Sequence, residues 1–189
     1  MDIFYRKMRK LKLDELRRPD IDTYKNSEKI PVVVVADNIR SAMNIGSIFR
    51  TADAFAVERV ILCGISAVPP NREITKTAIG ATESVQWHYE SDIVTAVMNL
   101  ENEGYYIAGV EQTDGSVSLE DTVFPIGKIA VVFGNEVEGI SDAILPLMNV
   151  CIEIPQFGTK HSLNVSVCAG IVMWELMKKY KPALQEQNK

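Results

Sequence analysis

Three short segments of this 189-residue chain place glycine beside polar or charged side chains. They read Asn44-Ile-Gly-Ser-Ile-Phe-Arg50, Phe133-Gly-Asn-Glu-Val-Glu-Gly139 and Ile154-Pro-Gln-Phe-Gly-Thr-Lys-His-Ser-Leu-Asn-Val-Ser166. Each lies where an apolar run changes to a helical pattern, which indicates a turn from a strand into a helix. Backbone N–H groups at the start of a helix lack partners within it, so such turns can bind a ligand. Three of them in one small domain predict a common site.

The third segment carries the most polar groups. Ser162, Leu163 and Asn164 stand at the head of a long apolar helix, after a loop that contains Pro155 and Gly158. Ser and Asn side chains at this position either cap the helix, by accepting from its free N–H groups, or face a substrate. Both interpretations stay open on this segment alone.

The elements that must position these segments alternate along the chain. Apolar runs, several of them rich in Val and Ile, predict buried strands at residues 31–36, 59–63, 105–110, 128–133 and 150–154. Helical patterns fill the gaps at residues 44–55, 92–103, 141–148 and 162–180. This alternation predicts an α/β fold with a parallel sheet covered by helices on both faces.

The composition, with 47% hydrophobic and 24% charged residues, is that of one globular domain. No apolar run approaches the roughly 20 residues that cross a bilayer, and the first ten residues lack the apolar core of a signal peptide. We therefore expect a cytoplasmic protein with no membrane partner. Cys63, Cys151 and Cys168 are odd in number and widely spaced, which favours reduced core cysteines over disulfides. With only two histidines in the chain, we expect no metal site.

In order and spacing, the three glycine-containing segments resemble the signature motifs of the SPOUT methyltransferases, specifically the SpoU/TrmH family of RNA ribose 2′-O-methyltransferases. The resemblance covers about residues 30–180. It implies a parallel-sheet SPOUT fold whose C-terminal segment forms a deep trefoil knot, a feature that the general rarity of knots would argue against. It also implies S-adenosylmethionine as the methyl donor and a homodimer that uses the last helix.

The residues that hold the donor are implied by the resemblance. Backbone groups of the knotted loops would bind S-adenosylmethionine at Phe133, Gly134, Ile154, Ser162 and Leu163. Glycine suits position 134, because a residue without Cβ lets a ligand approach the backbone closely.

The catalytic residues implied by the motifs are Asn44, Arg50, Glu136, Ser162 and Asn164. Arg50 follows Asn44 by six residues, as the catalytic Arg does in the family's first motif, although a surface ion pair is the plain alternative. Arginine holds its proton too tightly to act as a base. Binding the target phosphate and polarising the 2′-hydroxyl is easier chemistry. A carboxylate at Glu136 could orient Asn44 or Arg50.

The stretch Thr159-Lys160-His161 departs from the family's usual pattern, which has apolar or acidic residues there. Lys160 and His161 could contact RNA phosphate or alter the choice of substrate. His161 could also act as a base.

The last helix gives independent support for a subunit interface. Apolar side chains lie around much of its circumference between residues 163 and 177. One face of a sheet cannot cover all of them, so a small domain would bury the remainder against another subunit.

Charge is unevenly distributed along the chain. The formal net charge is −5, but residues 1–18 carry seven basic side chains against three acidic ones. This basic end is either an RNA-contacting arm or a solvated amphipathic helix. We divide the chain into a basic N-terminal extension at 1–29, expected to be helical, a SPOUT methyltransferase domain at 30–180, and a C-terminal tail at 181–189.

The predicted function is methyl transfer from S-adenosylmethionine to a ribose 2′-hydroxyl of structured RNA. We favour tRNA, because no separate N-terminal RNA-binding domain is evident in the sequence. Methylation of rRNA and a non-catalytic RNA-binding protein that keeps the knotted fold are the alternatives. A nicotinamide-binding protein is disfavoured, because residues 134–139 lack the Gly-x-Gly turn that admits a pyrophosphate.

Overall fold

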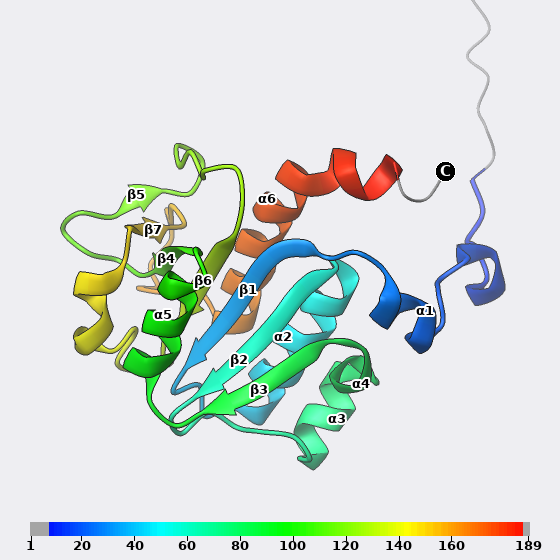
Figure 1. Ribbon diagram of the computed structural model, residues 1–189, viewed down its shortest axis with the longest axis horizontal. Helices are drawn as coiled ribbons and strands as arrows, with labels where there is room; N and C mark the ends of the chain where they lie inside the picture. The colour runs from blue at the N-terminus through cyan, green and yellow to red at the C-terminus, as the bar shows by residue number, and fades with distance from the viewer. Residues whose placement is uncertain (1–7, 187–189) are drawn as a thin grey trace, which may run out of the picture.

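The structure is a computed structural model that describes residues 8–186. Its centre is a seven-stranded sheet in the order β3-β2-β1-β6-β4-β7-β5, in which neighbouring strands are parallel (Figure 1). The strands are β1 (Ile30–Asp37), β2 (Val57–Cys63), β3 (Gln86–Glu90), β4 (Tyr106–Val110), β5 (Val117–Ser118), β6 (Ile129–Phe133) and β7 (Val150–Glu153). The helices are α1 (Ile21–Asn26), α2 (Ala42–Ala54), α3 (Arg72–Ala78), α4 (Ala81–Ser84), α5 (Ile93–Asn102) and α6 (Val165–Glu186), with 3-10 helices η1 (Leu13–Leu16) and η2 (Asp142–Leu147).

The central strand β1 shows why the sheet is buried on both faces. Val32 and Val34 contribute to one apolar core, Val33 and Val35 contribute to the other, and all four are fully buried. Because side chains alternate across a strand, one continuous apolar run supplies both faces. The prediction of a parallel α/β sheet covered on both faces is confirmed.

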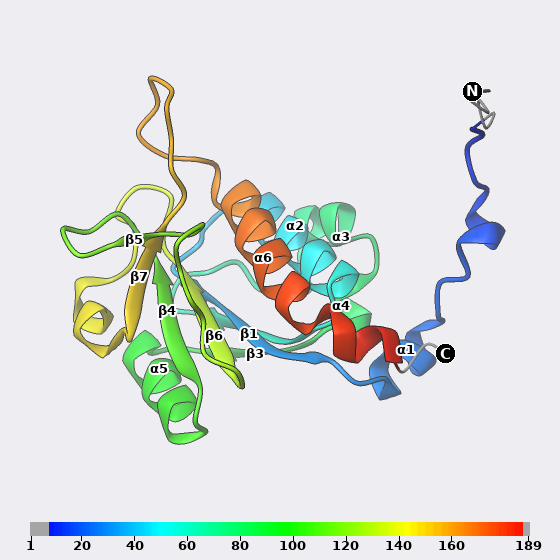
Figure 2. The same ribbon diagram turned by 90° about the horizontal axis from the view of Figure 1, so that it is seen from above.

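Helices form a layer on each side of the sheet (Figure 2). On one side α2 packs between α3 and α6, and these helices share a core with Val32 and Val34. On the other side α5 and η2 share a core with Val33 and Val35. None of the helices in the described part of the chain combines the length and apolar character needed to span a membrane.

The five predicted strands correspond to β1, β2, β4, β6 and β7, whereas β3 and β5 were not predicted. β3 lies at the edge of the sheet and reads Gln86-Trp-His-Tyr-Glu90, so it shows no apolar run. The short helices η1, α1, α3 and α4 were also not predicted individually. The predicted helix at 141–148 is the 3-10 helix η2, which contains Pro146, a residue that lacks a backbone donor.

The last helix begins and ends later than predicted. α6 starts at Val165 instead of residue 162, so Ser162, Leu163 and Asn164 belong to the loop before it. It continues past Pro182 to Glu186, so residues 181–186 of the predicted tail are helical. At the other end, η1 and α1 lie within the predicted extension, and residues 8–20 run away from the sheet (Figure 1). Residues 1–7 and 187–189 of the two terminal predictions lie outside the described residues.

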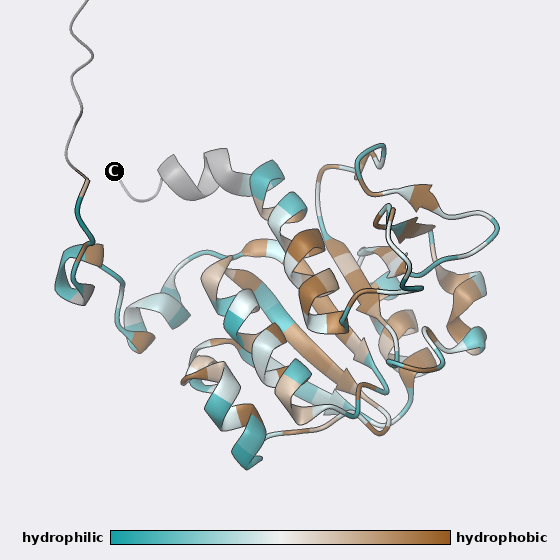
Figure 3. Cartoon of the chain, turned by 180° about the vertical axis from the view of Figure 1, so that it is seen from behind, coloured by the Kyte–Doolittle hydropathy of each residue, from teal (hydrophilic) through white to brown (hydrophobic). Residues whose placement is uncertain are grey.

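One side of α6 is only partly covered. Its inner side is fully buried through Ala169, Val172, Met173 and Leu176. Its outer stripe consists of Val167, Ile171 and Trp174, which are 52%, 37% and 48% exposed. Figure 3 shows hydrophobic residues along the first half of α6, on the face where it runs beside α2.

The three cysteines are free thiols in the structure. Cys63 is buried, whereas Cys151 and Cys168 are only half-buried, so the prediction of core residues holds fully for Cys63 alone.

Gly46 of the first motif lies inside α2, where this helix meets α3. A Cβ here would lie 1.9 Å from Thr77 Oγ1 and 2.6 Å from the carbonyl oxygen of Ile74. We expect Gly46→Ala to lower the free energy of unfolding by about 1–3 kcal/mol through overpacking, although alanine is the better helix former. Chemical denaturation measures the change. The control is Gly170→Ala in α6, where nothing lies within 4 Å of the added Cβ, and it should stabilise by about 0.5–1 kcal/mol. A stabilised Gly46→Ala variant would contradict the close α2–α3 contact.

Candidate active site

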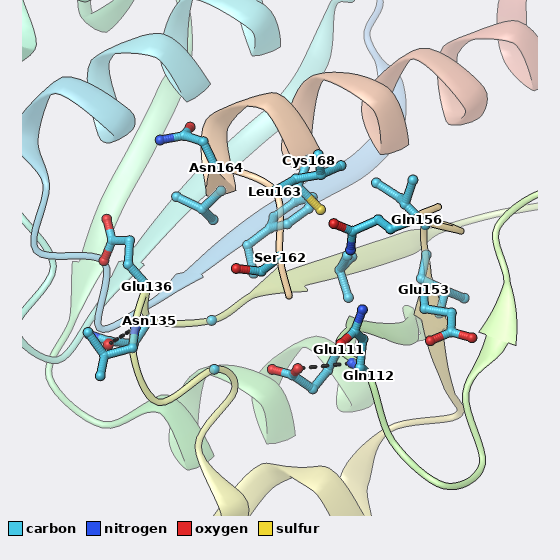
Figure 4. Close-up of a pocket in the computed structure, with 18 residues that line it drawn as sticks. Glu111, Gln112, Asn135, Glu136, Glu153, Gln156, Ser162, Leu163, Asn164 and Cys168 are labelled. Atoms are coloured by element: carbon cyan, nitrogen blue, oxygen red, sulfur yellow. Dashed lines mark hydrogen bonds between the residues drawn. The ribbon is translucent and has the colours of Figure 1, made fainter. Parts of the chain in front are cut away.

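The motif segments meet at the carboxyl ends of β4, β6 and β7. The loop after β6 (134–141), the loop between β7 and α6 (154–164) and the residues that follow β4 enclose a cavity of about 400 Å³ (Figure 4). Parallel strands collect their carboxyl ends at one edge of the sheet, which is where α/β folds bind ligands. The five residues predicted to hold the donor all line this cavity: Phe133, Gly134, Ile154, Ser162 and Leu163.

Three residues form one hydrogen-bonded chain at the mouth of the cavity, one from each motif. Asn164 Nδ2 donates to Asn44 Oδ1 at 3.1 Å, and Asn44 Nδ2 donates to Glu136 Oε1 at 2.9 Å. Glu136 and Asn164 line the cavity, while Asn44 reaches them from α2. The orienting contact that the sequence left open, from Glu136 to Asn44 or Arg50, is therefore made to Asn44.

Asn164 also caps α6. Its Oδ1 accepts from the Ser166 N–H at 2.9 Å and from Ser166 Oγ at 2.7 Å, while its Nδ2 makes the contact to Asn44. The capping interpretation is therefore confirmed, and the nitrogen of the same amide serves a different partner, Asn44.

The loop after β6 folds tightly on itself. Asn135 and Gly139 exchange backbone hydrogen bonds of 2.8 and 3.0 Å. Gly139 has a φ of +72°, a conformation that glycine adopts without strain. A Cβ at Gly134 would lie 2.1 Å from the carbonyl carbon of Gly139. The close packing of Gly139 against Gly134 therefore requires glycine at 134. This requirement is separate from the close approach of a ligand, which stays a prediction from the sequence.

Carboxylates beside both strands that flank β6 fix this loop. Asp37, at the end of β1, is fully buried and accepts from the Ser141 N–H at 2.7 Å and from Ser141 Oγ at 3.1 Å. Glu111, which follows β4, accepts from the Ile140 N–H at 2.9 Å. Two consecutive N–H groups are held from opposite sides by charge-assisted hydrogen bonds, which are stronger than neutral ones. The position of Glu136 on the same loop depends on this clamp.

Arg50 is not brought to the cavity. It is exposed on α2, does not line the cavity, and has no hydrogen-bond or ion-pair partner among residues 8–186. The surface ion pair that was the alternative for Arg50 is therefore not observed. Its guanidinium remains accessible to a partner outside the cavity.

The loop between β7 and α6 stands out from the body of the molecule (Figure 2). Lys160 and His161 are exposed on it, and Phe157 is 99% exposed. These side chains lie beyond the cavity, although Gln156 and Ser162 of the same loop line it.

One thiol lines the cavity. Burial, and then the charge of Glu111, raise the pKa of the Cys168 thiol to about 11. Because the thiolate is the nucleophilic form, Cys168 is unreactive near pH 7. In the part of the chain that the structure describes, no group of three or more His, Cys, Asp or Glu residues could hold a metal ion.

Comparison with known proteins identifies the family of this fold and site. The sequence model of the SpoU rRNA Methylase family matches residues 31–174. The chain belongs to the SpoU rRNA methylase family. The match spans all three motif segments, so the cavity and the hydrogen-bonded chain lie within the region that the family model covers.

Relatives of this SpoU chain include a Staphylococcus haemolyticus protein assigned to the TrmH family of tRNA/rRNA methyltransferases, which is 31% identical over 159 residues. The match covers 84% of this chain but 63% of that protein, so the chain spans less than two thirds of the relative's length. The TrmH/SpoU tRNA modifying enzyme of A. aeolicus superposes with a TM-score of 0.76 at 24% identity, covering 86% and 82% of the two chains. The AdoMet-bound rRNA methyltransferase of Sinorhizobium meliloti superposes with a TM-score of 0.74 at 21% identity, covering 82% and 60%. These structures share the fold.

Five polar residues of the cavity were not predicted, and Asn135 of the loop after β6 is one of them. The other four are Glu111, Gln112, Glu153 and Gln156. Glu111 and Gln112 directly follow the predicted strand 105–110, so the rule that ligands bind at the carboxyl ends of parallel strands could have found them.

Asn164 allows its two roles to be separated. Asn164→Ala removes the cap of α6 and should lower the free energy of unfolding by about 1 kcal/mol. Asn164→Asp keeps an oxygen that can accept from Ser166, so its stability should stay near that of the wild type, although the donor to Asn44 is lost. Denaturant titration of both variants measures the difference. Equal losses would show that the contact to Asn44, and not the cap, carries the stability.

Proposed function

We propose that this SpoU chain transfers a methyl group from S-adenosylmethionine to a ribose 2′-hydroxyl of a structured RNA, with tRNA favoured. In this reaction the methyl carbon bonds to the 2′-oxygen, its bond to the sulfonium sulfur breaks, and the hydroxyl proton is released. The observation that carries the proposal is the hydrogen-bonded chain Asn164–Asn44–Glu136, which joins the three motif segments at the mouth of one cavity.

The cavity fits S-adenosylmethionine in size and chemistry. Its volume of about 400 Å³ lies in the range of small-molecule sites. Apolar side chains offer contacts for a nucleobase, and uncharged polar groups offer hydrogen bonds to a ribose and an amino acid. These residues are Ile152, Ile154, Leu163, Gln112, Gln156 and Ser162. When bound, S-adenosylmethionine would supply an electrophilic methyl group. The shared fold of the AdoMet-bound S. meliloti enzyme supports this placement.

The residues at the mouth suit a ribose hydroxyl. Among the described residues, one carboxylate oxygen of Glu136 accepts a hydrogen bond from Asn44. The other oxygen can therefore accept a hydrogen bond from the substrate. Asn44 is held on both sides of its amide, which fixes its orientation before substrate arrives. Arg50 lies outside the cavity, where its guanidinium can bind the phosphate next to the target ribose.

Methyl transfer to RNA tests the proposal directly. The purified protein is incubated with methyl-labelled S-adenosylmethionine and total RNA, and the label is located by separating RNA species and by resistance of the 2′-O-methylated linkage to alkali. Label in the ribose of tRNA is expected. Label in rRNA would assign the alternative target, and label on a base would contradict ribose methylation. Saturable donor binding without label in any RNA would favour the non-catalytic RNA-binding protein.

Arg50→Ala should lower the single-turnover rate by about two orders of magnitude or more, the scale for losing a charged group that stabilises the transition state. The affinity for S-adenosylmethionine should stay nearly unchanged, because Arg50 does not line the cavity. Arg50→Lys keeps the charge but loses the planar fork, so an intermediate rate is expected. Rapid-quench rates and donor titrations measure the two effects. A wild-type rate for the alanine variant would remove Arg50 from the mechanism.

We also propose that the C-terminal segment forms the trefoil knot of the family and that the chain is a homodimer. After β7, on the far side of β4, the chain crosses back to α6, which packs on α2 and β1. The outer stripe of α6 is apolar and partly exposed, and Trp174 extends it toward Phe55 with ring centroids 5.8 Å apart. A second copy of this face would cover it.

The dimer can be tested with two variants that introduce the same charge at equally exposed positions. Trp174→Glu should shift the mass toward monomer or aggregate, because an unpaired carboxylate is costly to bury. Met98→Glu is the control, since Met98 is 49% exposed on α5 at the opposite face, against 48% for Trp174. Light scattering at micromolar concentration measures both. A stable, active wild-type monomer would contradict the dimer.

Exposed cations support an RNA partner despite the net charge of −5. Lys160 stands on the projecting loop next to the cavity, and the segment 8–18 that leaves the body carries several more basic side chains. They are Arg9, Lys10, Lys12, Arg17 and Arg18, of which Arg9 pairs with Glu15. Phosphate contacts draw on such groups, so the extension is proposed as an RNA-contacting arm.

A further inference from the structure

The charge of the cavity is one-sided. Three of its 18 lining residues are carboxylates, namely Glu111, Glu136 and Glu153, and no described lining residue is Lys, Arg or His. A concave site lined by one sign of charge concentrates its field on the ligand. The cavity therefore favours cationic ligands over neutral ligands of the same shape.

Glu111 is the carboxylate held most firmly. Its Oε1 accepts from the Gln112 N–H and its Oε2 from the Ile140 N–H, both at 2.9 Å. Figure 4 shows it across the cavity from Ser162, with Glu136 toward one edge and Glu153 toward the other. Each carboxylate oxygen has two lone pairs, so both oxygens keep an acceptor site after these bonds. The charge of Glu111 also reaches the opposite wall, because it contributes to the raised pKa of Cys168.

The donor and the product of methyl transfer differ in charge. S-adenosylmethionine carries a positive sulfonium in addition to the charges of its amino-acid part. S-adenosylhomocysteine has the same parts but a neutral thioether in place of the sulfonium. A fixed carboxylate near the sulfur distinguishes the two without any change of shape.

We propose that Glu111 makes this cavity selective for the cationic donor over the neutral product, with Glu153 adding to the effect. The inference rests on the proposed placement of S-adenosylmethionine in the cavity and names the residue that sets its selectivity. The transfer removes the positive charge, so the product loses attraction at the moment it forms. Glu111 thereby serves two purposes, because the bond that pins the loop at Ile140 also fixes the charge in place.

The experiment is calorimetric titration of three ligands in the absence of RNA. S-adenosylmethionine and S-adenosylhomocysteine differ in charge, and sinefungin carries an amine in place of the methylsulfonium, so it is cationic but cannot donate a methyl group. The measured quantity is the ratio of the product's Kd to the donor's Kd. Glu111→Gln should lower this ratio roughly tenfold, the scale of one partly screened charge pair. Glu153→Gln should lower it less.

Two further variants separate charge from structure. Gln156→Glu adds a carboxylate to the lining and should raise the ratio. Glu138→Gln makes the same exchange as Glu111→Gln, on the loop after β6 that Glu111 holds but outside this cavity, so the ratio should stay unchanged. Because both ligands need the same folded loop, general damage in Glu111→Gln weakens both equally and leaves the ratio at its wild-type value.

The outcomes are distinct. If the Kd of sinefungin changes across the variants as the Kd of S-adenosylmethionine does, selection by charge is supported. If the Kd of sinefungin changes as that of the product does, selection by charge is overturned. An unchanged ratio in Glu111→Gln together with an unchanged ratio in Gln156→Glu also overturns the inference, while leaving the proposed methyl transfer standing. If the wild type binds none of the three ligands, the placement of the donor fails, and the selectivity fails with it.

Discussion

Two carboxylates, Asp37 and Glu111, hold the consecutive N–H groups of Ser141 and Ile140, and the geometry of the site follows from this clamp. The sheet order places β6 between β1 and β4, so the loop that leaves β6 passes between the ends of its two neighbours. A loop of this length has many conformations in the unfolded chain, and ordering it carries an entropic cost that few contacts could offset. Charge-assisted hydrogen bonds from a fully buried Asp37 and from Glu111 are strong enough to select one conformation.

The clamp acts at a distance through Glu136. Once the loop is fixed, Glu136 lies beside α2, where it accepts a hydrogen bond from Asn44, and Asn44 in turn accepts one from Asn164 of the loop before α6. The contact from Asn164 closes the site and starts the last helix, because its other amide atom caps α6. Loop, helix start and cavity mouth are thus parts of one hydrogen-bonded unit. A substitution that breaks a hydrogen bond in one of these parts is therefore expected to shift the other two.

The sequence predicts the parts of this arrangement that have a local physical signature. Continuous Val and Ile runs predict the buried central strands, since such strands must be apolar on both faces. The family resemblance, and not a local signature, implies Phe133, Gly134, Ile154, Ser162 and Leu163, which the structure brings to one cavity. Edge strand β3 escapes prediction because exposure removes its apolar pattern. The start of α6 was misplaced by three residues, because a cap residue and the first turn of a helix look alike in a sequence.

Long-range pairs leave no such signature. Nothing in the order of residues shows that Glu111 would face Ile140 or that Asp37 would face Ser141, which lie 29 and 104 positions away. Gly46 illustrates the same limit, since the sequence predicts its helix but not the contact with Thr77 of α3 that leaves no room for a Cβ. Such requirements come from the three-dimensional path of the chain and become visible only when the neighbours are known.

Carboxylates in the cavity would repel the phosphates of the RNA that this protein is proposed to bind. The distance between the cavity and the exposed basic side chains removes this conflict. Exposed charges are largely screened beyond about 8 Å at physiological ionic strength, whereas charges in a cavity are screened less. Carboxylates inside the cavity therefore act mainly on a ligand within it. Lys160 and the basic segment 8–18 are exposed on parts that project from the body, where a polyanion meets them first. The negative net charge of the chain thus includes acidic side chains in the cavity and basic side chains on the projecting parts, and each group has a different partner. The local sign of the charge, and not the net charge, decides which ligand is attracted to each place.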